Sequence, residues 1–349
     1  MSRPVIALIA DPTSPEGCRE YLADAVELLT GTPPVRVDAR HFAVGGAGRG
    51  ERDGDRLRLQ VPEEELDFTP DVVVLYEIPP HRRAALAGFQ RLLDGHRAVS
   101  FHADPAAWRT ATEKNLTVRR LARDGVAQME TVVLSGPSPE EAADAFERLG
   151  RDTWARPVVG TGGSDTFHVT THAGLERAAA YYAAHGSDWL LSRDAGNVTA
   201  DGGRHQFRVF VLGDRVVHAR EHLQPSPDTP CNTCQGATPL HIAPGDLPPR
   251  LAELAIRATA SVGLPFAGVD LAVENGGVVF EVNVHPAFVE GELELVAVPY
   301  IQAHLDAMAA PAPSGAPVPL GRGAAGTSGP VGFTQGLVDL PAPGGETGE

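Results

Sequence analysis

Cysteine and long apolar runs are scarce in this chain of 349 residues. It has three cysteines, too few for the disulfide framework that stabilises many small secreted proteins. No stretch has the uninterrupted apolar length that a membrane-spanning helix needs. The first residues, MSRPVIALIADP, predict a buried strand rather than a signal peptide, because no long apolar stretch follows a basic region. We therefore expect a cytoplasmic protein.

Positive charge is scarce as well. The formal net charge is -16 at pH 7. Nucleic-acid backbones and anionic membranes attract basic surfaces, so we expect neither as a partner. The length allows two or three compact units with a sizeable core. This composition agrees with a soluble enzyme, and it leaves open whether the chain forms a homo-oligomer.

The sequence GVDLAVENGGVVFEVNVHP predicts a hairpin that gathers three oxygen ligands on one face. Two apolar runs flank an Asn-Gly-Gly turn, a type that joins antiparallel strands. If the turn centres on its Asn-Gly pair, Asp270 lies opposite Glu281, and Asn283 points to the same face. Facing carboxylates repel unless a cation lies between them, and oxygen ligands suit magnesium better than zinc. A solvated hairpin with scattered acids is the alternative.

This hairpin resembles the metal-binding core of the ATP-grasp superfamily, most closely that of the ribosomal-protein glutamate ligases, whose last strands read G-V-D and E-V-N-x-x-P. The resemblance implies a Rossmann-like α/β pre-ATP-grasp domain followed by an ATP-grasp fold of two α+β subdomains. It also implies that Asp270, Glu281 and Asn283 hold Mg²⁺ or Mn²⁺ against the phosphates of ATP.

The N-terminal part of the chain alternates strand and helix patterns, which is typical of a small parallel α/β domain. The predicted strands are 5–10, 71–76 and 98–101, and the predicted helices are 18–29 and 82–93. The polar segment GGAGRGERDGDR, residues 45–56, is predicted to be a surface loop or excursion. Together with the resemblance, this pattern gives a pre-ATP-grasp domain, two ATP-grasp subdomains and a tail, at 1–108, 109–188, 189–310 and 311–349.

Lys114 is the only lysine, whereas the other 28 basic residues are arginine. A chain so biased toward arginine that keeps one lysine favours a site that needs a compact ammonium rather than a planar guanidinium. An exposed lysine retained by chance is the alternative. Its surroundings, AAWRTATEKNLTVRRLARDGV, resemble the helix that opens the ATP-grasp core, where the family has a lysine that binds ATP.

A glycine-rich segment, RPVVGTGGSD, begins at Arg156. Its glycines free the backbone to bring N–H groups around a phosphate, although alone it also fits an ordinary β-turn. The resemblance implies that Arg156 replaces a family lysine and that Gly160, Gly162 and Gly163 approach the ATP phosphates. It also implies that residues 156–168 form a lid over the nucleotide.

Further segments follow in the family's order. WLLSRDAGN corresponds to the connection that contacts adenine and ribose, QFRVFV to a strand with an arginine beside the phosphates, and NTCQGA to the family loop N-L-x-R-G-G. The residues implied to contact ATP here are Ser192, Asp194 and Asn232, and those implied to stabilise the acyl phosphate are Arg208 and Arg220. Gln235 stands where the glutamate ligases have an arginine, which puts their acceptor specificity in doubt.

Two other motifs match the sequence patterns of zinc or redox sites. Cys231 and Cys234 have C-x-x-C spacing, but they follow several prolines in a loop, and a zinc site would need more ligands. We interpret them as incidental loop cysteines. His218 and His222 fit the H-x-x-E-H pattern of zinc peptidases, which requires a helix. The preceding residues predict a hairpin, and four residues of strand separate the histidines by about 13 Å, so a zinc peptidase is a weak alternative.

The resemblance implies an ATP-dependent carboxylate-amine ligase that works through an acyl phosphate and releases ADP and phosphate. Its substrates would be a carboxylate and an amine on small molecules or peptides, and the sequence does not identify them. A rival interpretation is an ATP-grasp-like nucleotide-binding module without ligase activity.

Residues 311–349 are rich in Pro, Gly and Ala and have few large apolar residues, which predicts a flexible tail. The apolar segment 332–340 within it is an alternative docking element.

Overall fold

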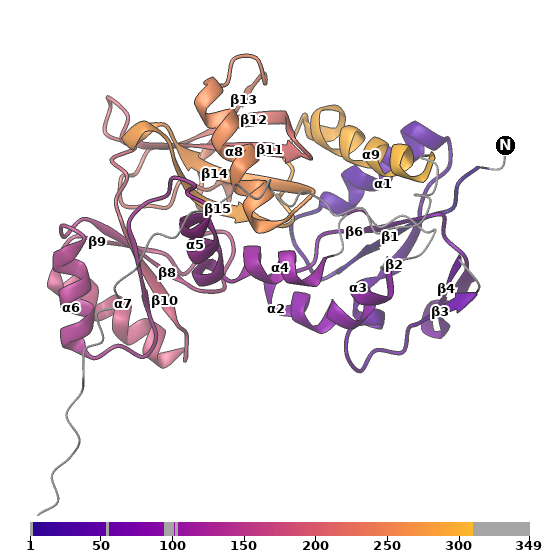
Figure 1. Cartoon of the computed structure of the whole chain (residues 1–349), viewed down its shortest axis with the longest axis horizontal. Coiled ribbons are helices and arrows are strands. Elements are labelled where there is room, and N and C mark those ends of the chain that lie inside the picture. The colour runs from indigo at the N-terminus through magenta and orange to yellow at the C-terminus, as the bar shows by residue number, and fades with distance from the viewer. Residues whose placement is uncertain (1–2, 54–55, 94–100, 102–103, 310–349) are drawn as a thin grey trace, which may run out of the picture. The chain divides into compact units, whose positions relative to one another are not determined.

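The structure, a computed structural model, describes residues 3–53, 56–93, 101 and 104–309. Figure 1 shows the arrangement of their helices and strands. Two predicted features lie outside the described residues: almost all of the strand at 98–101, and the tail at 311–349 with its apolar segment. The described residues belong to one compact unit.

A parallel sheet opens the chain, as the alternating pattern predicts. Its order is β2-β1-β6. The elements are β1 (Ile6–Ala10), α1 (Cys18–Thr30), β2 (Val35–Asp38), η1 (Ala39–Phe42) and β6 (Val72–Leu75). Every residue of β1 and β6 is buried, as expected of parallel strands covered on both faces. The carboxylate of Glu77 accepts hydrogen bonds from the backbone N–H groups of Gly17 and Arg19, which fixes the start of α1.

The prediction of a surface loop at 45–56 is wrong. The segment contains β3 (Arg49–Asp53), which pairs with β4 (Arg56–Val61), and β5 (Leu66–Phe68) completes an antiparallel sheet after η2 (Pro62–Glu64). Because β3 has no apolar residue, its sequence gives no strand signal. Gly50 is in β3 because the strand lies against Leu92: a Cβ there would be 2.3 Å from Leu92 Cδ2.

Two predicted helices are present but interrupted. The helix predicted at 82–93 consists of α2 (Pro80–Arg83), η3 (Ala84–Leu86) and α3 (Ala87–Leu93). The helix expected around Lys114 is divided into α4 (Pro105–Thr112) and α5 (Lys114–Arg123). The division falls at Glu113, whose backbone is extended at φ -89° and ψ 101°.

An antiparallel sheet of order β7-β10-β8-β9 follows. Its elements are β7 (Thr131–Leu134), α6 (Pro139–Arg148), β8 (Thr153–Pro157), β9 (Phe167–Val169), α7 (His172–Ala184) and β10 (Trp189–Arg193). Helices α6 and α7 lie together on this sheet (Figure 1), and Phe146, Tyr182 and Trp189 are buried in the core beneath them.

A third antiparallel sheet has the order β13-β12-β11-β14-β15. Its elements are β11 (Arg204–Leu212), β12 (Arg215–Gln224), η4 (Thr233–Gln235), β13 (Thr238–Ile242), α8 (Pro249–Val262), β14 (Phe266–Ala272), η5 (Glu274–Gly276) and β15 (Val278–Asn283). The hairpin predicted just before the H-x-x-E-H motif is confirmed, because Leu212 pairs with Arg215 across a two-residue turn. Helix α8 packs on β14 and β15.

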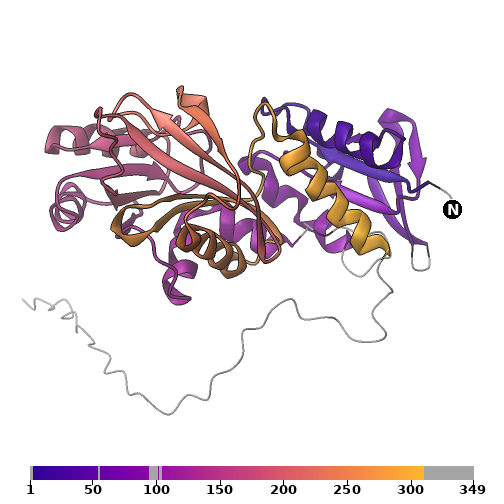
Figure 2. The same cartoon turned by 90° about the horizontal axis from the view of Figure 1, so that it is seen from above.

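The last described helix, α9 (Val298–Ala309), returns to the N-terminal sheet after η6 (Leu293–Ala297). Figures 1 and 2 both show α9 beside α1. Tyr300 and Ile301 of α9 share a buried cluster with Leu22 of α1 and with Phe266 of β14. This cluster therefore connects the first sheet to the last.

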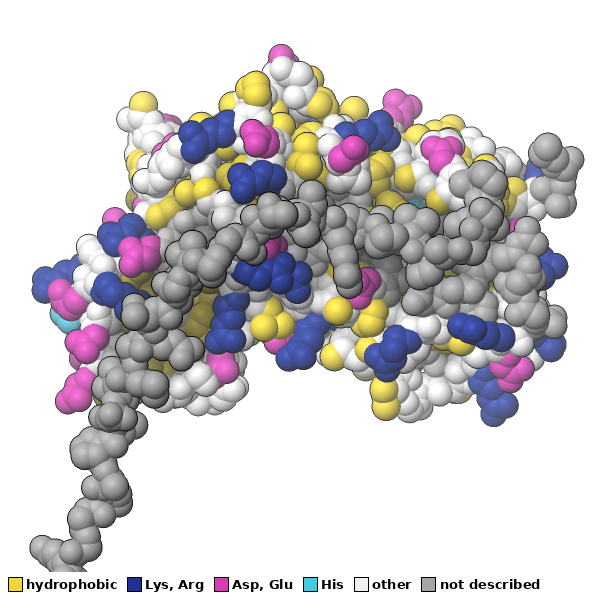
Figure 3. Space-filling model, viewed as in Figure 1, with side chains coloured by type: hydrophobic (Ala, Val, Ile, Leu, Met, Phe, Trp, Pro, Cys, Tyr) yellow, Lys and Arg dark blue, Asp and Glu magenta, His cyan; other side chains and the backbone are white. Residues whose placement is uncertain are grey.

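No helix within the described ranges is long and apolar enough to cross a membrane. On the face shown in Figure 3, basic and acidic side chains are interspersed.

Candidate functional site

One row of polar residues crosses all five strands of the C-terminal sheet. Directly opposed residues place Glu281, Asp270, Arg208, Arg220 and His241 in order from β15 to β13. Opposed residues of an antiparallel sheet share a face, so the five side chains start from the same side. The predicted pairing of Asp270 with Glu281 is thus confirmed, and the register shifts by one residue only beyond Asp270, at a bulge.

The three predicted oxygen ligands lie together at one end of this row. Asn283 donates a hydrogen bond from Nδ2 to Asp270 Oδ2 over 3.2 Å. Arg208 donates two hydrogen bonds of 2.7 Å to Asp270, and Lys114 Nζ lies 3.0 Å from Glu281 Oε1. The protein therefore supplies two cations that offset the carboxylate repulsion, which the sequence argument assigned to a metal alone. An all-oxygen set of two carboxylates and an amide still fits a hard cation.

A pocket of about 1640 Å³, including space open to solvent, lies beside this cluster. Its walls come from the N-terminal region, from the four-stranded sheet and from the five-stranded sheet. The predicted site residues that line it are Lys114, Arg156, Gly160, Gly162, Gly163, Ser192, Arg208, Asn232, Asp270, Glu281 and Asn283. Segments far apart in the sequence thus meet in one cavity.

Of the cationic side chains that line this pocket, Lys114 is buried and Arg156 is half-buried. Lys114 begins α5, and its Nζ also donates a hydrogen bond to Gly160 O over 3.3 Å. Arg156 lies on β8 and donates to Phe280 O over 3.2 Å and to Ser192 Oγ over 3.5 Å. Its Nε has no hydrogen-bond partner among the described residues. Burial lowers the pKa of Arg156 from its usual value, because it disfavours the charged guanidinium. An anion bound beside Arg156 would offset this cost.

The glycine-rich loop between β8 and β9 needs its glycines. Gly162 and Gly163 have φ of 65° and 72°, a region that favours glycine. A Cβ on Gly160 would lie 2.8 Å from Pro157 Cγ. The loop contacts the one that follows β12, because Gln235 Nε2 donates to Gly162 O over 3.0 Å. Asn232 starts that second loop by accepting a hydrogen bond from the Cys234 N–H.

Arg220 and Asp194 are not among the described residues that line the pocket. Arg220 is fully buried and donates to both carboxylate oxygens of Glu292 at 2.8 Å. Asp194 accepts hydrogen bonds from Trp154 Nε1 and the Gly196 N–H, and it is ion-paired with Arg204 at 2.7 Å. Both side chains are therefore engaged within the protein.

Several pocket residues escaped the sequence analysis. Glu16 and Arg83 come from the N-terminal region, and no motif marks them. Arg83 is held by Ile78 O and Thr112 Oγ1 at 2.9 Å each. Burial lowers its pKa to about 10, and burial likewise raises the pKa of Glu16. Trp154 could have been found, because it precedes Arg156 by two residues on β8 and so faces the same side.

An apolar part of the pocket suits a flat ring. Met129 and Ala195 form a small buried cluster with Val278 and the half-buried Phe280. Met129, Ala195 and Phe280 line the pocket, close to Ser192 in the connection predicted to contact adenine.

The two zinc-like motifs do not form zinc sites of the kind their letters resemble. His218 and His222 lie on a strand, as predicted, and not on a helix. His222 accepts a hydrogen bond from Arg220 Nε, whereas His218 contacts His241 and Glu292. Burial, reinforced by Arg208 and Arg220, lowers the pKa of His222 to about 3. Cys231 and Cys234 are free thiols, the first buried and the second exposed beside the pocket.

Comparison with known proteins agrees with this geometry. A family model of the RimK-like ATP-grasp domain matches residues 192–295. A curated relative, a probable alpha-L-glutamate ligase of Citrobacter koseri, is 29% identical over 178 residues, which are 50% of this chain and 56% of the relative. The chain thus spans about half the length of this relative, and shorter matches span 28% of others.

Solved structures share the fold over most of the chain. The ATP-grasp ligase PsnB in complex with a minimal precursor has a TM-score of 0.63 and 16% identity, covering 87% of this chain and 99% of its own. The D-alanyl-alanine synthetase A of Vibrio cholerae has a TM-score of 0.63 and 14% identity, covering 89% and 100%. The chain therefore has the fold of these ATP-grasp ligases, and its residues 192–295 match the model of the RimK-like ATP-grasp domain.

Proposed function

We propose that this chain is an ATP-dependent carboxylate-amine ligase. One observation carries the proposal: a single pocket joins the cations Lys114 and Arg156, a glycine-rich loop and the oxygen cluster around Asp270. These are the groups that bind a nucleotide triphosphate with its metal, and the comparisons with ATP-grasp ligases support the same activity.

The binding of ATP follows from the chemistry of the pocket. Met129 and Ala195 would hold the adenine ring, and the glycine-rich loop and Lys114 would bind the phosphates, because all of these residues line the pocket. Asp270, Glu281 and Asn283 would hold Mg²⁺, or Mn²⁺ in its place, and the bound ion would neutralise the charge of the phosphates. We propose that residues 156–168 close over the nucleotide and exclude water.

The reaction proceeds in two steps. An oxygen of the substrate carboxylate attacks the γ-phosphorus of ATP, the bond to the β-γ bridging oxygen breaks, and ADP leaves. An amine then attacks the carbonyl carbon of the acyl phosphate, loses a proton and expels inorganic phosphate, which leaves an amide. Arg208 is buried between the oxygen cluster and the rest of the row, where it can stabilise negative charge on the acyl phosphate. Although burial alone would lower the pKa of Arg208, Asp270 raises it, so this charge is permanent.

The residues that the N-terminal region contributes to the pocket wall indicate the chemical class of the substrate. Glu16 and Arg83 present one acidic and one basic group to the same pocket as Arg208. A substrate with both an amino and a carboxylate group, such as an amino acid or a peptide, matches this pair by charge. The named activities of the relatives, a glutamate ligase and a ligase with a peptide precursor, support this class.

We propose that residues 1–108 form a wall of the substrate site, that residues 109–188 contain the lid and that residues 189–310 contain the metal ligands. A cytoplasmic location fits this proposal, because ATP and free thiols are both maintained there.

The decisive experiment measures ADP formation with pooled amino acids, short peptides and organic acids, and identifies products by mass spectrometry. ADP release that requires a carboxylate, with an amide product, is expected. Glu281→Ala and Asn283→Ala should abolish it with little change in melting temperature, whereas Glu253→Ala, an exposed acid on α8, should not. Nucleotide binding without substrate-stimulated ADP release would instead identify a binding module, and full turnover of Glu281→Ala at saturating magnesium would refute the metal assignment.

A further inference from the structure

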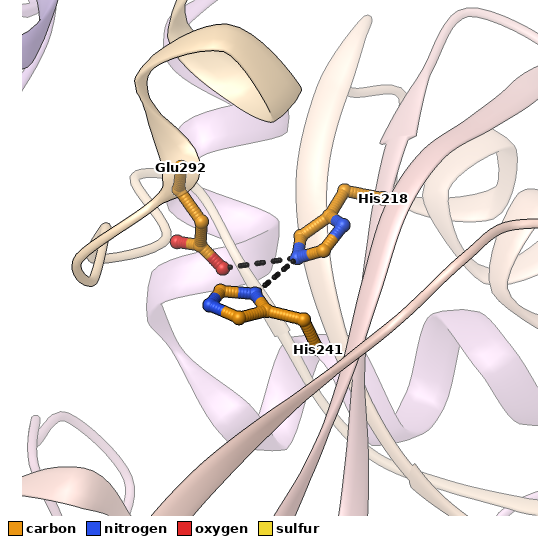
Figure 4. Close-up of side chains that lie close together, drawn as sticks. All are labelled: His218, His241 and Glu292. Carbon is orange, nitrogen blue, oxygen red and sulfur yellow. Dashed lines mark hydrogen bonds and ion pairs between the residues drawn. The ribbon is translucent and has the colours of Figure 1, made fainter.

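A second group of metal-type ligands lies outside the ATP pocket. His218 of β12, His241 of β13 and Glu292, which directly precedes η6, point toward one another (Figure 4). His218 Nε2 lies 3.1 Å from His241 Nδ1 and 3.3 Å from Glu292 Oε1. None of these three side chains is among the described residues that line the ATP pocket.

The hydrogen bonds define where the lone pairs point. His241 Nε2 lies 3.0 Å from the backbone oxygen of Glu290, which can only accept. In the neutral ring the proton of His241 is therefore on Nε2, and Nδ1 has a free lone pair. The Nε2 proton of His218 is then shared between Nδ1 of His241 and the Glu292 carboxylate. One proton thus occupies the point at which three potential ligand atoms converge.

The spacing suits a metal ion in place of that proton. With bonds of about 2.0 to 2.2 Å, tetrahedral ligand atoms lie about 3.3 to 3.6 Å apart. The two close pairs are already near this separation, and all three ligand atoms lie within 4.8 Å of one another. Only small side-chain movements are needed.

The surroundings orient the ligands as outer-shell groups do in metal sites. The contact of His241 with Glu290 O fixes its ring, and the Val289 N–H donates to Glu292 Oε2 over 2.9 Å. Gly291 has φ 87°, and a Cβ there would lie 3.4 Å from His241 Nε2. The loop can therefore approach His241 closely. His218 and Glu292 are buried but His241 is exposed, which leaves a route for an ion to enter.

The ion pair between Arg220 and Glu292 affects which metal ion this group of ligands can bind. The Arg220 guanidinium already neutralises the charge of Glu292, so a hard ion such as Mg²⁺, which depends on anionic oxygen ligands, gains little here. Two imidazole nitrogens instead favour a transition metal. We propose that His218, His241 and Glu292 bind a transition metal ion such as Zn²⁺, with a fourth position open to water or an anion. The bound ion joins β12 and the edge strand β13 to the segment that leads into α9.

Cobalt binding tests this site directly. The full chain, without a histidine tag and after treatment with a chelator, is titrated with Co²⁺ in excess Mg²⁺ and ADP, which occupy the nucleotide pocket. One equivalent with the visible absorption of tetrahedral Co²⁺ and no thiolate band is expected, which separates this site from Cys231 and Cys234. His241→Ala should weaken binding at least about tenfold, and His185→Ala, at another exposed histidine, should not change it.

Thermal unfolding gives a second readout that does not depend on catalysis. Because an ion that binds the folded state stabilises it, Zn²⁺ should raise the melting temperature of the wild type and of His185→Ala but not of His241→Ala. Without metal, His241→Ala should melt like the wild type because the side chain is exposed. Absence of Co²⁺ binding by the wild type, or equal binding by His241→Ala, would overturn the proposal.

Discussion

At the scale of single residues, the site is organised by paired charges. Asp270 is held by Arg208 and Glu281 by Lys114, and both acids remain on the pocket wall. Removing one partner of the buried Arg208–Asp270 pair would cost about 3 to 5 kcal/mol, because the other charge would be left uncompensated. The side chain of Glu281 is 25% exposed, so its pair with Lys114 contributes less to stability. These pairs therefore offset the repulsion between the two adjacent carboxylates.

Lys114 provides the sharpest residue-scale test. Its ammonium fits between Glu281 and Gly160 O, a space that a planar guanidinium does not match. Lys114→Arg should raise the Kd or KM for ATP, or lower turnover, by about tenfold or more, since a charged phosphate contact is worth about 1.5 to 3 kcal/mol. Arg119→Lys, an exposed basic position on the same helix, is the control. Wild-type kinetics in Lys114→Arg would mean that Lys114 is not an ATP ligand.

His304 of α9 should make the fold sensitive to acid. It is 1% exposed, and burial lowers its pKa from 6.5 to about 4. Between these pH values the unfolded chain binds the proton and the folded chain does not, so stability falls as the pH drops from about 6.5 to about 4. From pH 7 to pH 5 this residue should cost about 2 kcal/mol of unfolding free energy.

Urea unfolding at both pH values measures that loss. His304→Gln, which does not titrate, should lose less stability than the wild type, even if it is less stable at pH 7. His185→Gln, at an exposed position, should lose as much as the wild type. An identical loss in His304→Gln would exclude His304 as the cause.

At the scale of elements, local pattern decided what the sequence could predict. The pairing of Asp270 with Glu281 followed from a turn signal and a period of two, whereas the bulge that shifts the register next to Asp270 was not predicted. Strand β3 could not be predicted, because it contains no apolar residue and exists through its pairing with β4. The interruption between α4 and α5 at Glu113 could not be predicted from the sequence either. It depends on the hydrogen bond that the Lys114 N–H donates to Val158 O in a distant segment.

The glycine-rich loop supports a prediction at this scale. Gly163 and Gly186 both have positive φ, so alanine at either position should cost about 1 kcal/mol of stability through backbone strain. Only at Gly163 would the new Cβ also lie 3.0 Å from Pro230 Cβ, in the loop on the other side of the pocket. Gly163→Ala should therefore raise the KM for ATP severalfold, while Gly186→Ala should not. Equal ATP kinetics in the two variants would show that the loop does not bind phosphate.

At the scale of the whole molecule, the site joins segments that no local pattern connects. Short motifs pointed to the proposed phosphate and metal residues, because their spacing is fixed within single hairpins and loops. Glu16 and Arg83 were missed, since only the tertiary fold brings them to Arg208. Arg220 was predicted to stabilise the acyl phosphate from the family resemblance, but its side chain contacts Glu292 and is not among the described residues that line the pocket. Which groups a side chain contacts therefore depends on residues that are distant in sequence.

The C-terminal boundary of the fold gives the last prediction. A chain that ends at Ala310 keeps all of α9 and every proposed site residue, and the composition of residues 311–349 offers little apolar surface to bury. We expect unchanged melting temperature and ligase rate. A chain that ends at Ala297 lacks Tyr300, Ile301 and His304, which are buried against α1 and β14. Losing even one such large side chain costs about 3 to 5 kcal/mol, so this shorter chain should melt at least about 10 °C lower or fail to fold. A clear fall in melting temperature or rate for the chain ending at Ala310 would instead assign the segment 332–340 a docking role.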